Sequence, residues 1–221
     1  MIPGERKLLQ RTAADLGVFL QEAHLDAFET YLNELCLWNR RMNLTGIRSR
    51  ERMVVELVAD SLVPAPLLPD TGTMLDVGSG AGLPGIPVKI LKPGLRVDLL
   101  EPSAKKQAFL KQVIRLLGLK GLRAIRGRAE ESGSGLLVEG YDVVTARAVA
   151  GLREAVSLCA PHVRPGGALV GFVGRHLEPA LSEASEGLRK AALELDASVR
   201  YRLPGTEGDR HALLFRRHPT S

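Results

Sequence analysis

The residues best suited to bind a ligand lie in a glycine-rich segment, residues 75–85, which reads Leu-Asp-Val-Gly-Ser-Gly-Ala-Gly-Leu-Pro-Gly. The apolar run 74–77 predicts a short buried strand before the glycines, and an apolar helix ending at Leu91 is predicted after them. In a parallel sheet such a turn lies at the carboxyl ends of the strands, where ligands bind. Glycine is needed there because a Cβ would block a ligand that presses against the backbone.

Two classes of cofactor compete for this loop. The stretch 80–85 satisfies the dinucleotide pattern G-x-G-x-x-G. Asp76 followed by Gly78 and Gly80 instead fits the loop of S-adenosylmethionine enzymes. A dinucleotide would need free N–H groups at the helix N-terminus for its pyrophosphate, and Pro84 removes one of them. Asp76 would repel a pyrophosphate but suits an amine and a sulfonium. The methyl-donor interpretation is therefore favoured over the dinucleotide and over a turn without a ligand.

A second carboxylate follows the next predicted strand. Glu101 comes directly after the apolar run 96–100. An acidic residue at this place, about 20 residues beyond the glycines, can accept two hydrogen bonds from ribose hydroxyls. NAD sites use the same device, so Glu101 predicts a nucleoside ligand without choosing between the two cofactors. A solvated loop carboxylate is the alternative.

Two further strand ends carry polar candidates. Ala129 and Glu130 follow the predicted strand 122–126, where the loop would lie over the adenine; an ordinary helix start is the alternative. Arg147 follows the predicted strand 141–146, where the substrate-facing loop begins. Its guanidinium suits the methionine carboxylate or a phosphate, and a surface salt bridge is equally compatible.

The sequence lacks motifs that some methyl-transfer reactions require, and this narrows the possible acceptors. Methylation of an exocyclic amine usually requires a D/N-P-P-aromatic tetrapeptide, whereas the chain has Thr-Ala-Arg-Ala at 145–148. Methylation of pyrimidine C5 requires a cysteine nucleophile. Cys159 lies in a predicted helix and is interpreted as a core residue. An acceptor that is already nucleophilic remains, such as guanine N7, which has a free lone pair. Holding the acceptor close to the methyl donor would then account for most of the rate, so no catalytic base is predicted. No metal site is predicted either.

The charge balance is compatible with a polyanionic partner. Lys and Arg number 30 against 25 Asp and Glu, a net charge of +5, and aromatic residues make up only 4% of the chain. Such a chain would bind RNA through phosphates rather than by stacking on many bases. Solvated helix faces are the alternative for any one basic cluster. The three clusters are Arg40, Arg41, Arg48, Arg50 and Arg52; Lys105, Lys106, Lys111 and Arg115; and Arg200, Arg202, Arg210, His211, Arg216 and Arg217.

Hydrophobic periodicity predicts an α/β fold. Residues 1–68 are predicted to form a helical extension, and residues 69–221 alternate between strands and helices. Such alternation requires a mostly parallel sheet covered on both faces. Leu25, Phe28, Tyr31, Leu32 and Leu35 recur at helical spacing and are predicted to share one helix face. We expect seven strands, with helices at 151–163 and 177–195, a turn at 165–167, and a closing antiparallel hairpin with strands 199–203 and 212–215. Two separated cysteines, no signal peptide and no membrane-spanning run predict a reduced, cytoplasmic protein.

Several specific motifs are spread along nearly the whole chain. The Gly-Leu-Pro-Gly-Ile-Pro stretch at 82–87 is much more specific than a general glycine loop. The full set of motifs is Trp38-Asn39, Asn43-Leu44-Thr45, Asp60-Ser61, Asp76 to Pro87, Arg147-Ala148 and Gly208-Asp209-Arg210-His211. Together they resemble the bacterial RsmG (GidB) family.

The resemblance implies a Rossmann-like class I methyltransferase that uses S-adenosylmethionine to methylate guanine N7 in the decoding region of 16S rRNA. The expected partner is therefore 16S rRNA or the small ribosomal subunit, with the protein acting as a monomer away from membranes. The implied cofactor contacts are Gly78, Leu83, Ala129, Glu130 and Arg147, with Glu101 as ribose acceptor. Asp76 and Gly80, from the pattern of the glycine loop itself, complete the predicted cofactor-binding residues. The residues expected to face RNA are Asn43, Arg40, Arg41, Arg175, Arg210 and His211.

The sequence departs from the family pattern at two places. Leu57 stands where many members have a His, and Val173 precedes Gly174 where many have a Lys, with Arg175 next. Two other functions remain as alternatives: a methyltransferase acting on a small molecule, and an RNA-binding protein that performs no catalysis.

Overall fold

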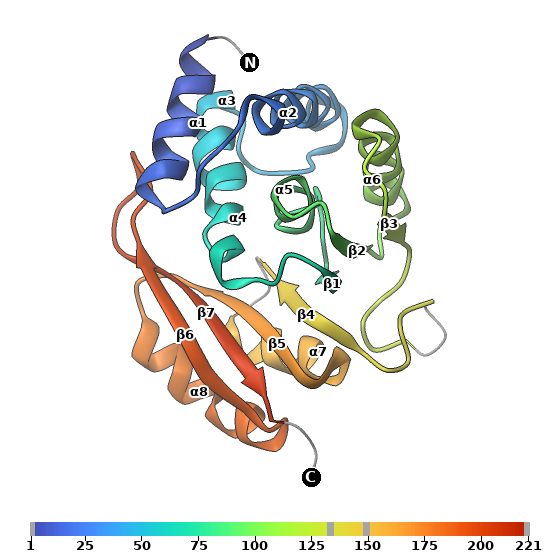
Figure 1. Ribbon diagram of the computed structural model, residues 1–221, viewed down its shortest axis with the longest axis vertical. Coiled ribbons are helices and arrows are strands. Elements are labelled where there is room, and N and C mark those ends of the chain that lie inside the picture. The colour runs from blue at the N-terminus through green and yellow to red at the C-terminus, as the bar shows by residue number, and fades with distance from the viewer. Residues whose placement is uncertain (1–2, 132–134, 148–150, 219–221) are drawn as a thin grey trace.

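A seven-stranded sheet of order β3-β2-β1-β4-β5-β7-β6 forms the centre of the computed structural model (Figure 1). Residues 3–131, 135–147 and 151–218 are described. Neighbours among β1 to β5 pair in parallel, and β7 pairs antiparallel with both β5 and β6. The predicted α/β fold with a closing antiparallel hairpin is confirmed. The strands are β1 (Gly72–Val77), β2 (Leu95–Leu100), β3 (Leu122–Ile125), β4 (Tyr141–Ala146), β5 (Val163–Val173), β6 (Leu193–Tyr201) and β7 (Arg210–Arg217).

Helices cover both faces of the sheet (Figure 1). Residues 50–62 form one continuous helical stretch whose middle, η1, is π-helical. No helix in the described ranges is long and apolar enough to cross a lipid bilayer. The helices are α1 (Pro3–Asp15), α2 (Glu22–Met42), α3 (Arg50–Arg52), η1 (Met53–Ala59), α4 (Asp60–Leu62), η2 (Ala65–Leu67), α5 (Gly85–Leu91), α6 (Ala104–Leu117), α7 (Leu152–Cys159), η3 (Ala160–His162) and α8 (Leu177–Lys190).

Successive residues of a strand pack alternately into two hydrophobic clusters, one on each face of the sheet. In β1, Met74 packs in the cluster shared with α1, α2, α5 and α6, whereas Leu75 and Val77 pack in the cluster shared with α7 and α8. This is the period of two that a strand imposes. The α2 residues with helical spacing, from Leu25 to Leu35, are all buried in the first cluster as predicted. The N-terminal helices thus share a core with the sheet, and the domain boundary at residue 68 stays a prediction.

Two predicted helices are too long. The helix predicted over 177–195 ends at Lys190, and β6 begins at Leu193, six residues before the predicted hairpin strand. Pairing with β7 determines this edge strand, because an edge position tolerates its exposed polar residues. The helix predicted over 151–163 ends at Cys159 in a 3₁₀ turn, and β5 already begins at Val163. The predicted turn at 165–167 lies inside β5, where the register with β4 shifts.

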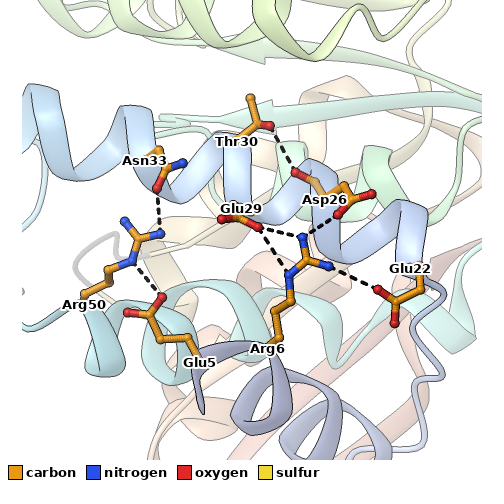
Figure 2. A network of polar contacts seen from close by, with 8 residues as sticks. All are labelled: Glu5, Arg6, Glu22, Asp26, Glu29, Thr30, Asn33 and Arg50. Atoms are coloured by element: carbon orange, nitrogen blue, oxygen red, sulfur yellow. Dashed lines mark hydrogen bonds and ion pairs between the residues drawn. The ribbon is translucent and has the colours of Figure 1, made fainter. Parts of the chain in front are cut away.

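Polar contacts join the three N-terminal helices (Figure 2). Arg6 of α1 binds three acids of α2, with distances of 3.1 Å from Nη1 to Glu22 Oε2 and 2.6 Å from Nη2 to Glu29 Oε2. Arg50 of α3 donates from Nε to Glu5 Oε2 of α1 (3.0 Å) and from Nη2 to Asn33 Oδ1 of α2 (2.8 Å). The start of the 50–62 helix is therefore held against both other helices.

One buried contact ties α2 to the glycine loop. The Tyr31 hydroxyl donates to the Ala81 carbonyl oxygen at 2.8 Å, and Tyr31 is fully buried. Burial raises the pKa of Tyr31, so the hydroxyl stays a neutral donor.

We expect Tyr31→Phe to lower the free energy of unfolding by about 1–2 kcal/mol, because the Ala81 carbonyl is left buried and unpaired. Amide hydrogen exchange should also accelerate within residues 78–83. The matched control is Tyr141→Phe, which removes another buried hydroxyl contact, 2.7 Å from Tyr141 to Asp98, at the opposite end of the strands. Equal exchange in the loop of both variants would contradict the link.

Candidate functional site

The polar residues predicted at strand ends meet at one edge of the sheet. Strands β1 to β5 are parallel, so the segments that follow them lie at the same carboxyl edge. The loop between β6 and β7, residues 202–209, reaches this edge because β7 returns antiparallel to β5. The edge carries the glycine loop, Glu101, the 127–131 turn and Arg147.

Two glycines of the loop expose bare backbone. Gly78 and Gly80 have φ angles of 67° and 57°, a region that favours glycine. A Cβ on Gly78 would have no neighbour within 4 Å, and one on Gly80 would meet only the Gly78 carbonyl at 3.8 Å. Gly82 differs, because its Cβ would lie 2.3 Å from Ile86 Cδ1. The first two glycines therefore leave room beside the backbone, and the third is required by packing.

Ser79 holds the loop in place through hydrogen bonds within the protein. Its N–H donates to the Leu100 carbonyl of β2 at 3.0 Å, and its hydroxyl donates to the Asp76 carbonyl at 2.8 Å. Its own carbonyl accepts from the N–H groups of Gly82 (2.7 Å) and Leu83 (3.0 Å). The Leu83 side chain is itself buried. The conformation of the loop is therefore fixed by contacts with the rest of the chain.

The start of α5 has no free N–H group for a pyrophosphate. Gly85 N–H donates to Asp76 Oδ2 at 2.9 Å, and Ile86 N–H donates to the Gly82 carbonyl at 2.8 Å. Pro87 has no N–H. Since a dinucleotide site depends on free amides at this position, the geometry disfavours the dinucleotide interpretation.

Asp76 is fully buried beneath the loop. Oδ2 accepts from Gly85, whereas Oδ1 has no hydrogen-bond partner in the described part of the chain. Burial raises the pKa of Asp76 to about 7, although the hydrogen bond from the Gly85 N–H acts in the opposite direction. Its demonstrated contact is with the loop itself, and a cofactor contact stays a prediction.

Glu101 joins the glycine loop to α6. Oε2 accepts from the Gly80 N–H at 2.9 Å, and Oε1 accepts from the Ser103 N–H at 2.9 Å. The side chain is buried. Each carboxylate oxygen can accept more than one hydrogen bond, so both can still receive a hydroxyl. This arrangement fits the vicinal hydroxyls of a ribose placed beside Gly80.

The turn after β3 is more open. Arg128 N–H donates to Glu131 Oε2 at 3.1 Å and so closes the turn around Ala129 and Glu130. The Ala129 carbonyl lies 3.0 Å from His162 Nε2, and Glu130 is exposed. The structure places both predicted residues at the cofactor edge, and their contact with adenine stays a prediction.

Arg147 forms a buried ion pair instead of a surface one. Nη1 donates to Asp60 Oδ2 (2.9 Å), to Ser61 Oγ (2.9 Å) and to the Leu57 carbonyl (3.2 Å). The Arg147 side chain is only 12% exposed. All these bonds use Nη1, and in the described residues Nη2 and Nε form none. The next residue of the motif, Ala148, lies outside the described ranges.

Asp60 is the shared acceptor of this region. Besides the Arg147 bond, its Oδ1 accepts from the Tyr201 hydroxyl of β6 at 2.8 Å and lies 3.4 Å from Arg210 Nη1 of β7. Burial and the Asp60 charge raise the pKa of Tyr201, which keeps the hydroxyl protonated as a donor. One carboxylate therefore connects α4 with the ends of three strands. The sequence offered only the Asp60-Ser61 motif as a signal for this role.

The predicted RNA-facing residues fall into different environments. Arg175 is exposed and lies over Gly208, whose Cβ would be 2.3 Å from Arg175 Cδ. Arg210 is partly buried by its bond to Asp60. His211 is a correction, because it is only 8% exposed within β7 and its Nδ1 has no partner in the described residues. It is not presented to a large ligand.

The other predicted RNA-facing residues lie at the C-terminal end of α2. Arg40 and Arg41 occupy the last turn of α2, and Asn43 ends the helix in the left-handed conformation with φ 49°. All three are exposed. Of the positions that depart from the family pattern, Leu57 is buried in the main core, and Val173 ends β5 opposite His211.

We expect Asp76→Asn to become more stable relative to the unsubstituted protein as the pH rises. The folded state holds the Asp76 proton up to about pH 7, whereas the unfolded state releases it near the ordinary pKa of an aspartate. The unsubstituted protein therefore loses stability as the pH rises from the unfolded-state pKa to the folded-state pKa, and Asp76→Asn does not. The stability difference between the two proteins should change by on the order of 2–4 kcal/mol between pH 4 and pH 8. Urea unfolding measures it, with the exposed Asp15→Asn as control. A pH-independent difference would contradict the assignment.

We expect Asp60→Ala to be strongly destabilising, by about 3–5 kcal/mol, because it leaves the buried Arg147 guanidinium without its partner. Tyr201→Phe removes a single hydrogen bond and should cost about 1 kcal/mol. Asp209 also binds two arginines, but Arg200 and Arg202 are themselves exposed, so Asp209→Ala should change stability little. Thermal unfolding of the three variants checks this order, which fails if Asp60→Ala and Asp209→Ala behave alike.

Comparison with solved structures agrees with the fold. A methyltransferase from Pyrococcus furiosus matches with a TM-score of 0.59 at 15% identity, covering 87% of this chain and 98% of that one. Fibrillarin from Aeropyrum pernix, solved with bound S-adenosyl-L-methionine, matches with a TM-score of 0.54 at 22% identity, covering 70% and 73%. At these identities the similarity establishes the fold alone.

Comparison with sequences is more specific. The family model for rRNA small subunit methyltransferase G, GidB, matches residues 24–211. The protein of that name from Acetivibrio thermocellus is 36% identical over 97% of this chain and 90% of its own length. The one from Chloroflexus aggregans is 38% identical over 98% and 91%. The resemblance seen in the sequence motifs is confirmed, and the chain belongs to the GidB family.

Proposed function

We propose that this chain is an S-adenosylmethionine-dependent methyltransferase that methylates guanine N7 in 16S rRNA of the small ribosomal subunit. The observation that carries the proposal is the preformed glycine loop with Glu101 beside it and no free amide at the start of α5. Membership of the GidB family supplies the substrate class, because relatives in that family are named as methyltransferases of small-subunit rRNA.

The residues at the edge fit the cofactor. Gly78 and Gly80 leave space beside the backbone, and Glu101 has acceptor capacity for two ribose hydroxyls. The unpartnered Oδ1 of Asp76 suits a cofactor that carries a positive charge nearby. Leu83, Ala129, Glu130 and Arg147 complete the proposed contact set.

When bound, S-adenosylmethionine supplies a methyl group on a sulfonium, which a ring nitrogen with a free lone pair can attack without losing a proton. The chain need only hold guanine N7 in line and exclude water, so we propose no catalytic acid or base. The two cysteines are consistent with this. Burial raises the pKa of Cys159, which lies fully buried on α7, and Cys36 lies on α2 away from the strand ends.

RNA contacts are proposed for the exposed or partly exposed candidates Asn43, Arg40, Arg41, Arg175 and Arg210. Arg175 and Arg210 lie at the cofactor edge, and the others lie at the end of α2. A monomeric state and a cytoplasmic location stay predictions.

We expect Glu101→Ala to weaken S-adenosylmethionine binding at least about tenfold, because two charge-assisted hydrogen bonds are lost. Titration calorimetry with the cofactor and its demethylated product measures this. The matched control is Glu178→Ala, which removes an exposed carboxylate from the first turn of α8. Binding of NADH but not of the methyl donor would overturn the cofactor assignment.

The acceptor is tested with tritiated S-adenosylmethionine, deproteinised 16S rRNA and intact small subunits. The product should be N7-methylguanosine in the rRNA. Cofactor binding without methyl transfer to either substrate would favour the RNA-binding protein without catalysis. Methylation of small molecules, with no RNA affinity that falls with salt, would favour the small-molecule enzyme.

A further inference from the structure

A basic pocket lies on the N-terminal helices and the loop between them, and within the described ranges no residue that follows a strand lines it. It has a volume of about 310 Å³ and opens between the last turn of α2 and the start of the 50–62 helix. Its walls carry Arg40, Arg48 and Arg50 together with Asn43. Among the described residues that line it, none is acidic. The pocket is therefore suited to an anion.

Two of the three guanidinium groups are not neutralised. Arg40 and Arg48 are exposed and form no ion pair with any described residue. Arg50 is different, because its Nε donates to Glu5 at 3.0 Å and its Nη2 to Asn33 at 2.8 Å (Figure 2). The Arg50 side chain is therefore held in place as part of the pocket wall. The guanidinium groups of Arg40 and Arg48 supply the positive charge that an anion could bind.

The side chain of Asn39 shapes the pocket. Its Nδ2 donates to the Ile47 carbonyl (3.1 Å), and its Oδ1 accepts from the Thr45 N–H (2.9 Å). Ile47 N–H in turn donates to Thr45 Oγ1 at 3.2 Å, and Leu44 is buried in the main core. These bonds fix the loop that carries Arg48 relative to the helix that carries Arg40. A preformed site loses less entropy when it binds.

We infer that this pocket binds a backbone phosphate of the RNA substrate, with Arg40 and Arg48 as the ligands. The inference rests on the proposed function, and it adds a second RNA contact separate from the cofactor edge. Guanidinium groups match phosphate oxygens with two parallel hydrogen bonds, and two of them converging on a concave site suit one phosphate. Arg41 is excluded because it does not line the pocket. Asn39 positions the loop and is not a ligand.

The test compares Arg40→Gln and Arg48→Gln with Arg189→Gln in the full chain. Arg189 is exposed on α8, so its substitution changes the net charge equally at a distant place. Binding of a labelled 16S rRNA fragment is measured by fluorescence anisotropy at several KCl concentrations. Each pocket variant should weaken binding several-fold and reduce the slope of log K against log salt, by at most about 1 because the two arginines share one phosphate. The control should bind like the unsubstituted protein, and calorimetry should show unchanged cofactor affinity in all variants.

The outcomes separate the two proposals. Pocket variants that bind RNA like the control, or an unsubstituted protein that binds no RNA, would overturn the pocket assignment. The same variants are also titrated with polyglutamate as a model of an acidic protein segment. If they lose binding to polyglutamate but keep binding to RNA, the assignment of the pocket to RNA is overturned in favour of an acidic protein segment. RNA binding that depends on Arg40 and Arg48, together with no methyl transfer by the unsubstituted protein, would leave the pocket in place and overturn the proposed function.

Discussion

Two buried carboxylates hold the glycine loop by its backbone N–H groups, and the site depends on these bonds. Asp76 accepts from Gly85, and Glu101 accepts from Gly80, both at 2.9 Å. The same bonds decide the class of ligand, because the amide that a pyrophosphate would use is already occupied. The Glu101 carboxylate beside the loop favours a ligand with hydroxyl and cationic groups over one with phosphates.

The loop is also supported from outside the sheet. Tyr31 of α2 bonds to Ala81, so the N-terminal helices and the cofactor loop share a buried contact. Asp60 makes a second connection, from α4 to Arg147, Tyr201 and Arg210. Because buried guanidinium groups are unfavourable without an acid, these elements must stay together for the edge to form. The N-terminal segment is therefore part of the structure that shapes the site.

This arrangement gives separate roles to residues that are neighbours in the sequence. Asn39 and Thr45 hold a loop together, whereas Arg40 and Arg48 keep their charges exposed. In the hairpin, Arg210 reaches toward Asp60, while the adjacent His211 is buried within the sheet. Alternation along a strand places neighbours on opposite faces, so a basic cluster in the sequence does not become one basic surface.

Local patterns in the sequence determined the α/β fold, the buried face of α2, the glycine loop, the position of Glu101 after β2 and the family. Short-range rules are sufficient there because strand, turn and helix periodicity act within a few residues. The tertiary structure alone decided the partner of Arg147, the burial of His211, the start of β6 at Leu193 and the pocket between Arg40 and Arg48. Arg147 and Asp60 are 87 positions apart, and pairing at that distance leaves no period or spacing in the sequence. The start of β6 and the pocket depend on how nearer segments fold back on one another, which the periodicity of a single strand or helix does not encode.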